Sequence, residues 1–198
     1  MAPYFESVKS FADVPLTNEG IETESFLEAS DGLLQLFDLL GNGAVFGFVQ
    51  SDIKGNIAGV RHRYESTREK SGTLEELVRS ESGEPTKHAT PSLTRLIRGL
   101  MFTCRALQNM QRDTSSELHA CFKRSYDEVL RHHHTFIIRS VVYVAIRAVP
   151  RRSDFYERIS QGGSHEKLNA ELARWLEGLD KIVERMRHFL ADGGYGRV

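Results

Sequence analysis

The C-terminal part of the chain carries one apolar face for about six helical turns, and this pattern constrains the fold most. Apolar residues recur there every three or four positions, the spacing of one helix face: Leu168, Leu172, Trp175, Leu176, Leu179, Ile182, Val183, Met186, Phe189 and Leu190. The sequence "DGG" at 192–194 ends the pattern. A helix of this length must pack its apolar face against other elements.

Helical periodicity continues through most of the remaining chain, with no repeat and no convincing pair of strands. We expect helices over 21–41, about 45–68, 72–81, 90–110, 115–149 (two helices or one bent helix) and 151–160. The first twenty residues have little periodicity and two of the five prolines, so we expect a loose arm at about 1–20. The sequence predicts an all-α protein, one domain over 1–198, with about eight helices packed in layers.

Local signals place some helix ends. Thr73 and Glu76 have the spacing of a capping box. Thr90 is a suitable N-cap, because Pro91 then takes the first helical position, where a missing N–H costs nothing. Residues 136–149 are apolar nearly all round, which predicts burial on more than one side.

Composition excludes several classes of protein. The 26 basic and 27 acidic residues nearly cancel, so no overall field favours nucleic acid. Cys104 and Cys121 lie in apolar helical patterns and are expected to be reduced core cysteines. The N-terminus lacks the apolar stretch of a signal peptide, and no apolar run is long enough to span a bilayer. We therefore expect a cytoplasmic protein that works in solution or on a membrane surface.

The sequence gives little support for a metal or for catalysis. Three consecutive histidines, at 132–134, would point in different directions on a helix, and no HExxH or CxxC pattern accompanies them. His134 is the one expected to face inward. No strained nucleophile turn and no phosphate-binding glycine loop is present. We expect no enzyme, no cofactor and no metal.

Asp52 and Asn56, in "SDIKGNI", are one turn apart and share a helix face. Taken alone, such a pair more often lies on the surface. However, the apolar run "AVFGFV" comes just before it. A polar pair at the mouth of an apolar lining suits an amphiphilic ligand, whose head is bound by hydrogen bonds while its tails are buried.

Arginines form two further groups. Arg95 and Arg98 are three residues apart on one helix, where a solvated edge is the simple alternative to a binding role. The arginines that flank the apolar helix before Pro150 form either a solvated rim or a patch for anionic lipid headgroups: Arg139, Arg147, Arg151 and Arg152.

These motifs together resemble one known family. The stretches "IETESFLEA", "SDIKGNI", "LTRLIRGLMF", "YDEVLRHHHTF" and "VPRRSDFYERIS" occur in the order and spacing of the glycolipid transfer protein family, and they are most similar to its fungal members. The resemblance runs from about Ile21 to the C-terminus. It implies a two-layer helical sandwich that moves a sphingolipid between membranes without chemical change.

The resemblance also implies roles for individual residues. Asp52 matches the aspartate that binds the amide nitrogen and the head, and Asn56 matches a sugar contact. His134 matches the histidine that donates to the ceramide amide carbonyl. Phe136 matches an aromatic residue at the membrane-facing tip, and Tyr195 matches a C-terminal tyrosine near the head.

Two positions depart from the glycolipid-binding branch. Arg95 replaces the tryptophan on which the first sugar stacks, and the one tryptophan of the chain is Trp175. Gly59 stands where that branch has a lysine, and the missing side chain is expected to leave room for a larger head or for water. The branch that carries ceramide-1-phosphate has arginine at the platform position, but lysine and a further arginine where this chain has Asn56 and Pro91. We expect an anionic head such as ceramide-1-phosphate, with glycosylceramide transfer or a sensor with weak transfer as alternatives.

The expected site has three parts. The headgroup and amide site comprises Asp52, Asn56, Gly59, Arg95, Arg98, His134 and Tyr195. The chain pocket comprises Phe37, Val45, Phe46, Val49, Leu130, Ile138 and Val142. Phe136 touches the membrane. The expected partners are a sphingolipid and, transiently, a membrane surface, and the absence of a heptad seam favours a monomer.

Overall fold

The structure, a computed structural model, describes residues 3–41 and 44–198, without the side chains of 44 and 45. Within these ranges it has nine α-helices, three short 3₁₀-helices and no strand, so the predicted all-α class is confirmed with one helix more than expected. The helices are α1 (Tyr4–Ser7), α2 (Thr23–Leu40), α3 (Ala44–Ser66), α4 (Leu74–Ser82), α5 (Ala89–Arg112), α6 (Leu118–Val129), α7 (Phe136–Ala148), α8 (Arg152–Ser160) and α9 (His165–Asp192). The 3₁₀-helices are η1 (Phe11–Asp13), η2 (Arg68–Lys70) and η3 (Arg131–His133).

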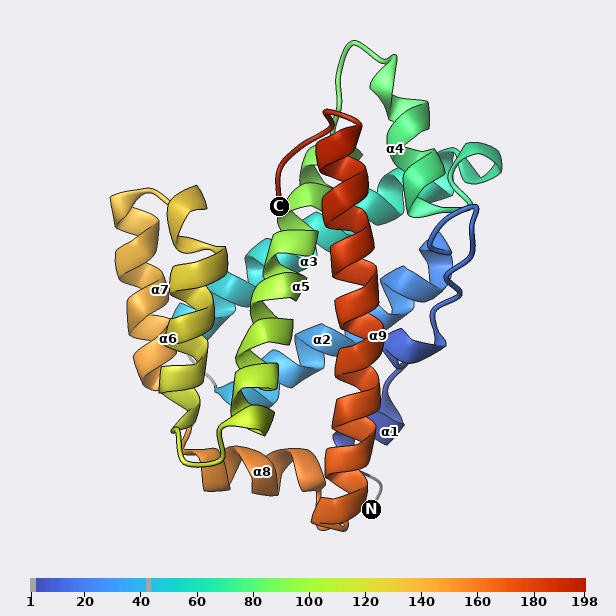
Figure 1. Cartoon of the computed structure of the whole chain (residues 1–198). Coiled ribbons are helices and arrows are strands. Elements are labelled where there is room, and N and C mark those ends of the chain that lie inside the picture. The colour runs from blue at the N-terminus through green and yellow to red at the C-terminus, as the bar shows by residue number, and fades with distance from the viewer. Residues whose placement is uncertain (1–2, 42–43) are drawn as a thin grey trace.

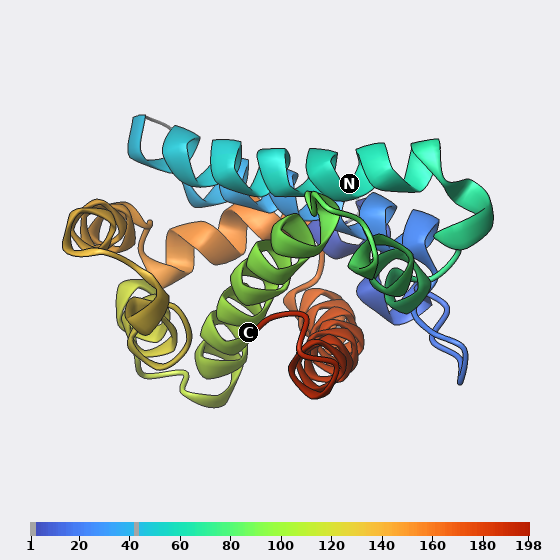
Figure 2. The same ribbon diagram turned by 90° about the horizontal axis from the view of Figure 1, so that it is seen from above.

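The long helices form two layers. Seen from above, α2 and α3 lie along one side, and α5, α6 and α9 lie along the other (Figure 2). Helix α5 contacts α3 across the layers and α6 and α9 within its own layer. Helices α6 and α7 stand together at one edge, and α8 closes one end (Figure 1). Most residues of the predicted site lie between α3 on one side and α5 and α7 on the other.

Residues 4–14 pack against the core, so the expected loose arm is wrong over this stretch, whereas 15–19 are exposed. Phe5 and Phe11 are buried, and their ring centroids lie 5.3 and 5.1 Å from that of Trp175 on α9. Gly178 makes this close packing possible, because a Cβ there would lie 2.2 Å from the backbone nitrogen of Ala12. The buried aromatic residues have no helical spacing, which explains why periodicity did not reveal their packing.

Helix α5 carries both arginines of the predicted site, and its first turn is capped from α4. The carboxylate of Glu81 accepts hydrogen bonds from the backbone N–H groups of His88, Ala89 and Thr90 at 2.8, 2.8 and 2.6 Å. Burial by itself raises the pKa of Glu81, but these hydrogen bonds outweigh it and hold the pKa below its ordinary value. The expected N-cap at Thr90 is wrong: the helix begins at Ala89, because a carboxylate of the preceding helix satisfies its free N–H groups.

The region 115–149 forms two helices, α6 and α7, joined by η3. The expected burial of α7 on more than one side is wrong, since its buried residues are Val142, Ala145 and Ile146. Phe136, Ile137 and Val144 on the same helix are 82 %, 74 % and 54 % exposed. Helix α7 therefore packs along one side and presents apolar side chains to solvent on the other.

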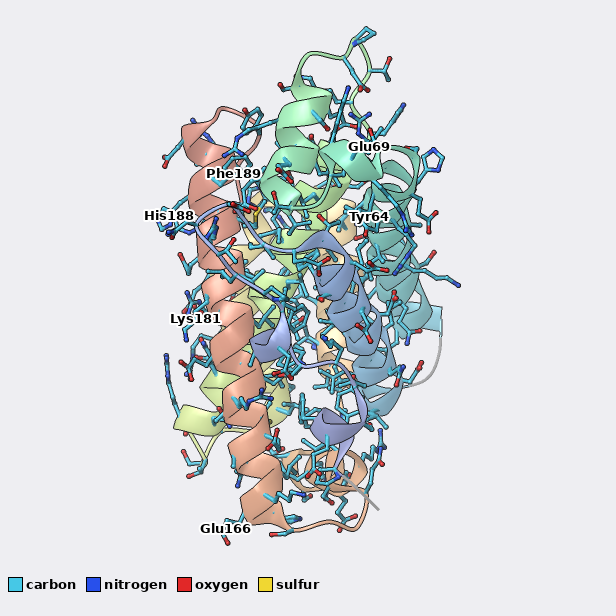
Figure 3. All side chains as sticks on the ribbon, turned by 90° about the vertical axis from the view of Figure 1, so that its right-hand side faces the viewer. Tyr64, Glu69, Glu166, Lys181, His188 and Phe189 are labelled. Atoms are coloured by element: carbon cyan, nitrogen blue, oxygen red, sulfur yellow. The ribbon has the colours of Figure 1, made fainter. Side chains whose placement is uncertain are left out.

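Helix α9 has the amphipathic character that its sequence predicts. Its apolar face is buried, whereas Glu166, Lys181 and His188 point outward along the opposite face (Figure 3). The capping box of α4 is also confirmed, with both bonds between Thr73 and Glu76 present at 3.0 and 3.2 Å. Among the helices of the described residues, none is both long and apolar enough to cross a bilayer.

Candidate functional site

A cavity of about 290 Å³ lies between the two layers and brings most of the predicted site residues together. Helices α2, α3, α5 and α7 and the η3 turn supply its wall. The lining residues are Phe37, Phe48, Val49, Asp52, Ile53, Arg95, Arg98, Gly99, Phe102, Leu130, His133, His134, Ile138 and Val142. Charged and imidazole groups share this wall with aliphatic and aromatic side chains, so the cavity suits an amphiphilic molecule.

Asp52 and Asn56 form a hydrogen-bonded pair on α3. The Nδ2 atom of Asn56 donates to Oδ2 of Asp52 at 3.2 Å. Asp52 is exposed and lines the cavity, whereas Asn56 is buried and does not line it. Asn56 thus supports the aspartate from behind. Its expected direct contact with the head remains a prediction that this geometry does not support.

His134 faces the cavity as expected, and its ring is held by α6. The hydroxyl of Tyr126 lies 3.2 Å from Nδ1 of His134. Burial lowers the pKa of His134 and outweighs the opposing effect of the Asp52 charge, so the imidazole is neutral at pH 7. Burial also raises the pKa of the Tyr126 phenol to about 12, which keeps its proton available. The hydroxyl of Tyr126 thus occupies Nδ1, and Nε2 is the ring nitrogen left for a ligand. In the tautomer protonated on Nε2, Tyr126 donates to Nδ1 and His134 donates through Nε2.

The backbone around His134 is fixed by Arg139. Its Nε–H donates to the carbonyl oxygens of Arg131 and His134, both at 3.0 Å. These bonds link the η3 turn to the first turn of α7. The three histidines therefore do not lie on one α-helix, as the sequence argument assumed. Residues 131–133 form a 3₁₀-helix, and His134 has an extended backbone. Within the described part of the chain, no group of three histidine, cysteine or acidic side chains has a metal-binding arrangement.

Arg95 and Arg98 lie on the same wall, one turn apart on α5. Arg95 is exposed, and Arg98 is half-buried. Burial, and then the charge of Arg95, lower the pKa of the Arg98 guanidinium, although an arginine side chain remains protonated. The Nε and Nη2 atoms of Arg98 both donate to the backbone carbonyl of Arg197, with the Nε distance at 2.9 Å. Two neighbouring cations at one cavity wall favour an anionic group between them.

The apolar part of the cavity contains most of the predicted chain-pocket residues. Phe37, Val49, Leu130, Ile138 and Val142 all line it. Phe46 lies beyond it, in a second cavity of about 30 Å³ whose wall shares Phe37, Val49, Phe102 and Val142 with the first. The side chain of Val45 lies outside the described part of the structure.

Gly59 and Tyr195 do not line the cavity, contrary to expectation. A Cβ on Gly59 would lie 2.5 Å from Oγ of Ser92, so the missing side chain lets α3 approach α5 and leaves no room for a larger head. Tyr195 stacks on Phe189 with ring centroids 5.4 Å apart. Gly59 departs because α3 packs closely on α5, and Tyr195 departs because its ring folds back on the end of α9; a match of single positions includes neither contact.

The sequence patterns missed several cavity residues. Ile53 is one turn beyond Val49, and Phe102 is one turn beyond Arg98, so helical spacing alone could have found both. His133 and the supporting Tyr126 were missed because the turn at η3 breaks the helical register. Phe136 is exposed at the start of α7, where a membrane contact requires it to be.

Comparisons with known proteins agree with this geometry. A family model described as glycolipid transfer protein matches residues 21–161. A glycolipid transfer protein of Aureobasidium melanogenum is 38 % identical over 189 residues, with 95 % of this chain and 92 % of that relative covered. The crystal structure of HET-C2, a fungal glycolipid transfer protein, superposes with a TM-score of 0.89 at 38 % identity, covering 95 % of this chain and 96 % of that one.

A more distant structure shares the fold. Human ceramide-1-phosphate transfer protein, in complex with 12:0 ceramide-1-phosphate, superposes with a TM-score of 0.84 at 18 % identity, covering 98 % of each chain. The helical architecture, the cavity between its layers and the match over residues 21–161 lead to one assignment. The chain belongs to the glycolipid transfer protein family.

Proposed function

We propose that this protein transfers a sphingolipid between membranes without making or breaking bonds in it. One observation carries the proposal: Asp52, His134 and two arginines share a cavity wall with at least five apolar side chains. The head and amide of the lipid bind at the polar wall, and its hydrocarbon chains bind along the apolar wall. We also propose that the protein acts as a monomer, because its sequence has no heptad seam.

The amide of the ceramide is the part of the lipid that the site selects most directly. An amide offers one N–H donor and one carbonyl acceptor. Asp52 accepts the N–H, and Nε2 of His134 donates to the carbonyl, because Tyr126 holds the other ring nitrogen at 3.2 Å. A glycerolipid with ester linkages has no N–H for Asp52, and a carboxylate left unpaired in the site disfavours that lipid.

The polar wall favours an anionic head. Arg95 and Arg98 offer guanidinium groups, which bind phosphate oxygens through paired N–H donors. The sugar platform of the glycolipid-binding branch has no substitute here. Trp175 is 1 % exposed and packs against Phe5 and Phe11, away from the cavity. We therefore propose ceramide-1-phosphate, or a lipid with a similar phosphate head, as the preferred cargo.

A neutral glycosylceramide is the second candidate. The relative from Aureobasidium melanogenum is a glycolipid transfer protein, and it covers nearly the whole chain. The Asp52–Asn56 pair, which the resemblance associates with sugar binding, is intact at 3.2 Å. Guanidinium groups also donate to sugar hydroxyls, so this candidate needs a direct comparison of the two lipids.

The energetics explain why a carrier is useful. A sphingolipid buries about thirty methylenes in its bilayer, and at ~0.8 kcal/mol each this amounts to ~24 kcal/mol. Spontaneous desorption over such a barrier takes on the order of a day. A protein cavity that replaces the bilayer around the chains lowers the barrier without chemical change. We also propose that the protein works from the cytoplasm and touches membranes transiently through Phe136 and Ile137, which are 82 % and 74 % exposed.

Cargo binding requires the wall to move. The cavity of about 290 Å³ lies at the lower end of the roughly 300–1,000 Å³ found for small-molecule sites, and two long chains need more than that. Helix α7 is the element best placed to move, because one side of it packs against the core and the other is free. Displacing α7 from α3 widens the apolar wall while α5 keeps both arginines in place.

A vesicle assay tests the proposal. Phosphatidylcholine donor vesicles carry fluorescent ceramide-1-phosphate or fluorescent glucosylceramide, and unlabelled acceptor vesicles are added in excess. We expect the protein to accelerate transfer of both lipids over the spontaneous rate, with ceramide-1-phosphate faster. Acceleration of glucosylceramide alone supports the second candidate. Lipid uptake seen by native mass spectrometry without any acceleration contradicts transfer and indicates a binding or sensor module.

A further inference from the structure

His133 is a cavity residue to which neither the motif nor the proposed amide site gives a role. It ends the η3 turn and lines the cavity together with Arg95 and Arg98. Its backbone N–H donates to the carbonyl of Leu130 at 2.9 Å, which fixes the turn. Its ring lies against that of His132, with centroids 4.4 Å apart. The side chain thus lies at the polar wall.

The ring of His133 has an unused hydrogen-bonding group. Its Nε2 atom is buried and finds no hydrogen-bond partner among the described residues. Buried polar atoms in proteins are nearly always paired, and an unpaired one is a cost that calls for an explanation. Burial, and then the charge of Arg98, lower the pKa of His133 to about 4, so its imidazole is neutral at pH 7. A neutral imidazole in the tautomer protonated on Nε2 donates a hydrogen bond there, and an acceptor at Nε2 favours that tautomer.

We propose that His133 selects the phosphate head of the cargo, by donating Nε2–H to a phosphate oxygen held by Arg95 and Arg98. This inference deepens the proposed sphingolipid transfer and rests on it. The chemistry of the wall supports the choice of phosphate. A phosphate monoester mainly offers acceptors, so two guanidinium groups and an imidazole N–H suit it. A sugar hydroxyl also donates, and the acceptor on this wall, Asp52, is already assigned to the ceramide amide.

A role in binding the head also accounts for the unpaired Nε2 of a residue at the cavity wall. Cargo entry must widen the cavity beyond about 290 Å³, and the η3 turn directly precedes α7, the helix that we propose to move. A rotation of the His133 ring, whose Nε2 is buried in this structure, then brings that nitrogen to the head. The cost of the unpaired nitrogen is then recovered when the lipid binds, and a lipid without the matching oxygen recovers less.

The test compares two substitutions at His133 with a matched control. His133→Leu removes the donor, and His133→Gln keeps an N–H donor of similar reach. His132→Leu is the control, because its ring is adjacent but exposed. Each variant is assayed for transfer of ceramide-1-phosphate and glucosylceramide between phosphatidylcholine vesicles, for lipid uptake by native mass spectrometry, and for its thermal unfolding midpoint before lipid is added.

We expect His133→Leu to lower the rate and uptake of ceramide-1-phosphate about tenfold, the effect of one hydrogen bond to a charged group. Glucosylceramide transfer should change less than about twofold. The unfolding midpoint should stay the same or rise, since an unpaired buried nitrogen is removed, and His133→Gln should restore most of the ceramide-1-phosphate activity. The control should behave as the unchanged protein.

Other outcomes separate this role from the proposed function. An equal loss for both lipids, or a lower unfolding midpoint that accounts for the loss, overturns the role of His133 and leaves sphingolipid transfer intact. A loss confined to glucosylceramide overturns the assignment to phosphate. If the unchanged protein takes up and transfers neither lipid, both the proposed function and the role of His133 are wrong.

Discussion

Replacing Asp52 by valine removes the acceptor on which the proposed recognition of ceramide depends. Valine is close to aspartate in size, so the change removes two oxygens with little change in volume. One lost interaction is with the amide N–H of the lipid. The other is the hydrogen bond from Asn56 Nδ2 at 3.2 Å, and Asn56 is buried. The variant therefore alters both lipid binding and the free energy of unfolding, and the two effects must be measured separately.

The structure allows the size of each effect to be worked out. A hydrogen bond to a charged group contributes ~1.5–3 kcal/mol, so we expect transfer of any ceramide-based lipid to fall by about 10-fold to 150-fold. The buried amide of Asn56 loses its partner, which lowers the free energy of unfolding by ~1–3 kcal/mol. Asp52→Asn keeps a carbonyl acceptor without the charge, so both losses should be smaller, at ~0.5–1.5 kcal/mol for a neutral hydrogen bond.

The assay needs a control that loses the same kind of bond elsewhere. Asp38 on α2 is exposed and accepts a hydrogen bond from Nε2 of Gln50 at 2.7 Å, so Asp38→Val breaks a carboxylate–amide bond outside the cavity. We expect this control to change transfer by less than about twofold, because exposed polar pairs contribute little. Urea unfolding of each variant gives the fraction folded, and vesicle transfer is then scaled to folded protein. Asp52→Val transferring ceramide-1-phosphate and glucosylceramide at the unchanged rate would refute the shared amide site.

Three further substitutions test other parts of the site. Tyr126→Phe should lower transfer about 3-fold to 10-fold with a small change in stability, because His134 loses the partner that holds its ring at Nδ1; an unchanged vesicle rate would contradict a role for that ring orientation. Arg95→Trp should shift the ratio of the two transfer rates toward glucosylceramide, and an unchanged ratio would show that Arg95 does not contact the head. Gly59→Ala should lower the free energy of unfolding by about 1 kcal/mol despite the better helix propensity of alanine, since its Cβ would lie 2.5 Å from Ser92 Oγ. Adding Ser92→Ala should recover part of that loss in urea unfolding, and a gain in stability from Gly59→Ala alone would contradict the packing argument.

The features that the sequence predicted correctly are those encoded within one helix. The apolar face of α9 depends on residues three and four apart, and the capping box of α4 joins Thr73 to Glu76. The pairing of Asp52 with Asn56 also follows from their spacing, and the structure shows the bond at 3.2 Å. Each of these interactions spans one or two turns, so the backbone geometry of the helix is enough to predict it.

Most features that the sequence did not predict depend on contacts between different elements. Glu81 caps α5 from another helix, and Phe5 and Phe11 pack on a tryptophan more than a hundred residues away. Gly59 stands against Ser92 of α5, a contact that its place in a motif does not reveal. In the site, His133 was missed because the turn before α7 is not helical in the expected register. Local patterns identify elements, whereas the identity of a neighbour across the core depends on the whole fold.

The polar wall explains how a carrier of this kind can both bind and release its cargo. The main polar groups have partners within the protein: Asn56 for Asp52, Tyr126 for His134, and a backbone carbonyl for Arg98. A lipid that binds these groups therefore replaces or shares hydrogen bonds that already exist within the protein. The net gain in binding free energy per hydrogen bond is then modest. A modest gain suits transfer, because a cargo bound as tightly as the sum of its contacts would not be delivered to the acceptor membrane. Two groups on this wall are exceptions: Arg95, which makes no hydrogen bond or ion pair with the described residues, and the buried Nε2 of His133. Selectivity for the head then depends on these groups, which gain a partner without giving one up inside the protein, while the exchanged bonds keep the lipid releasable.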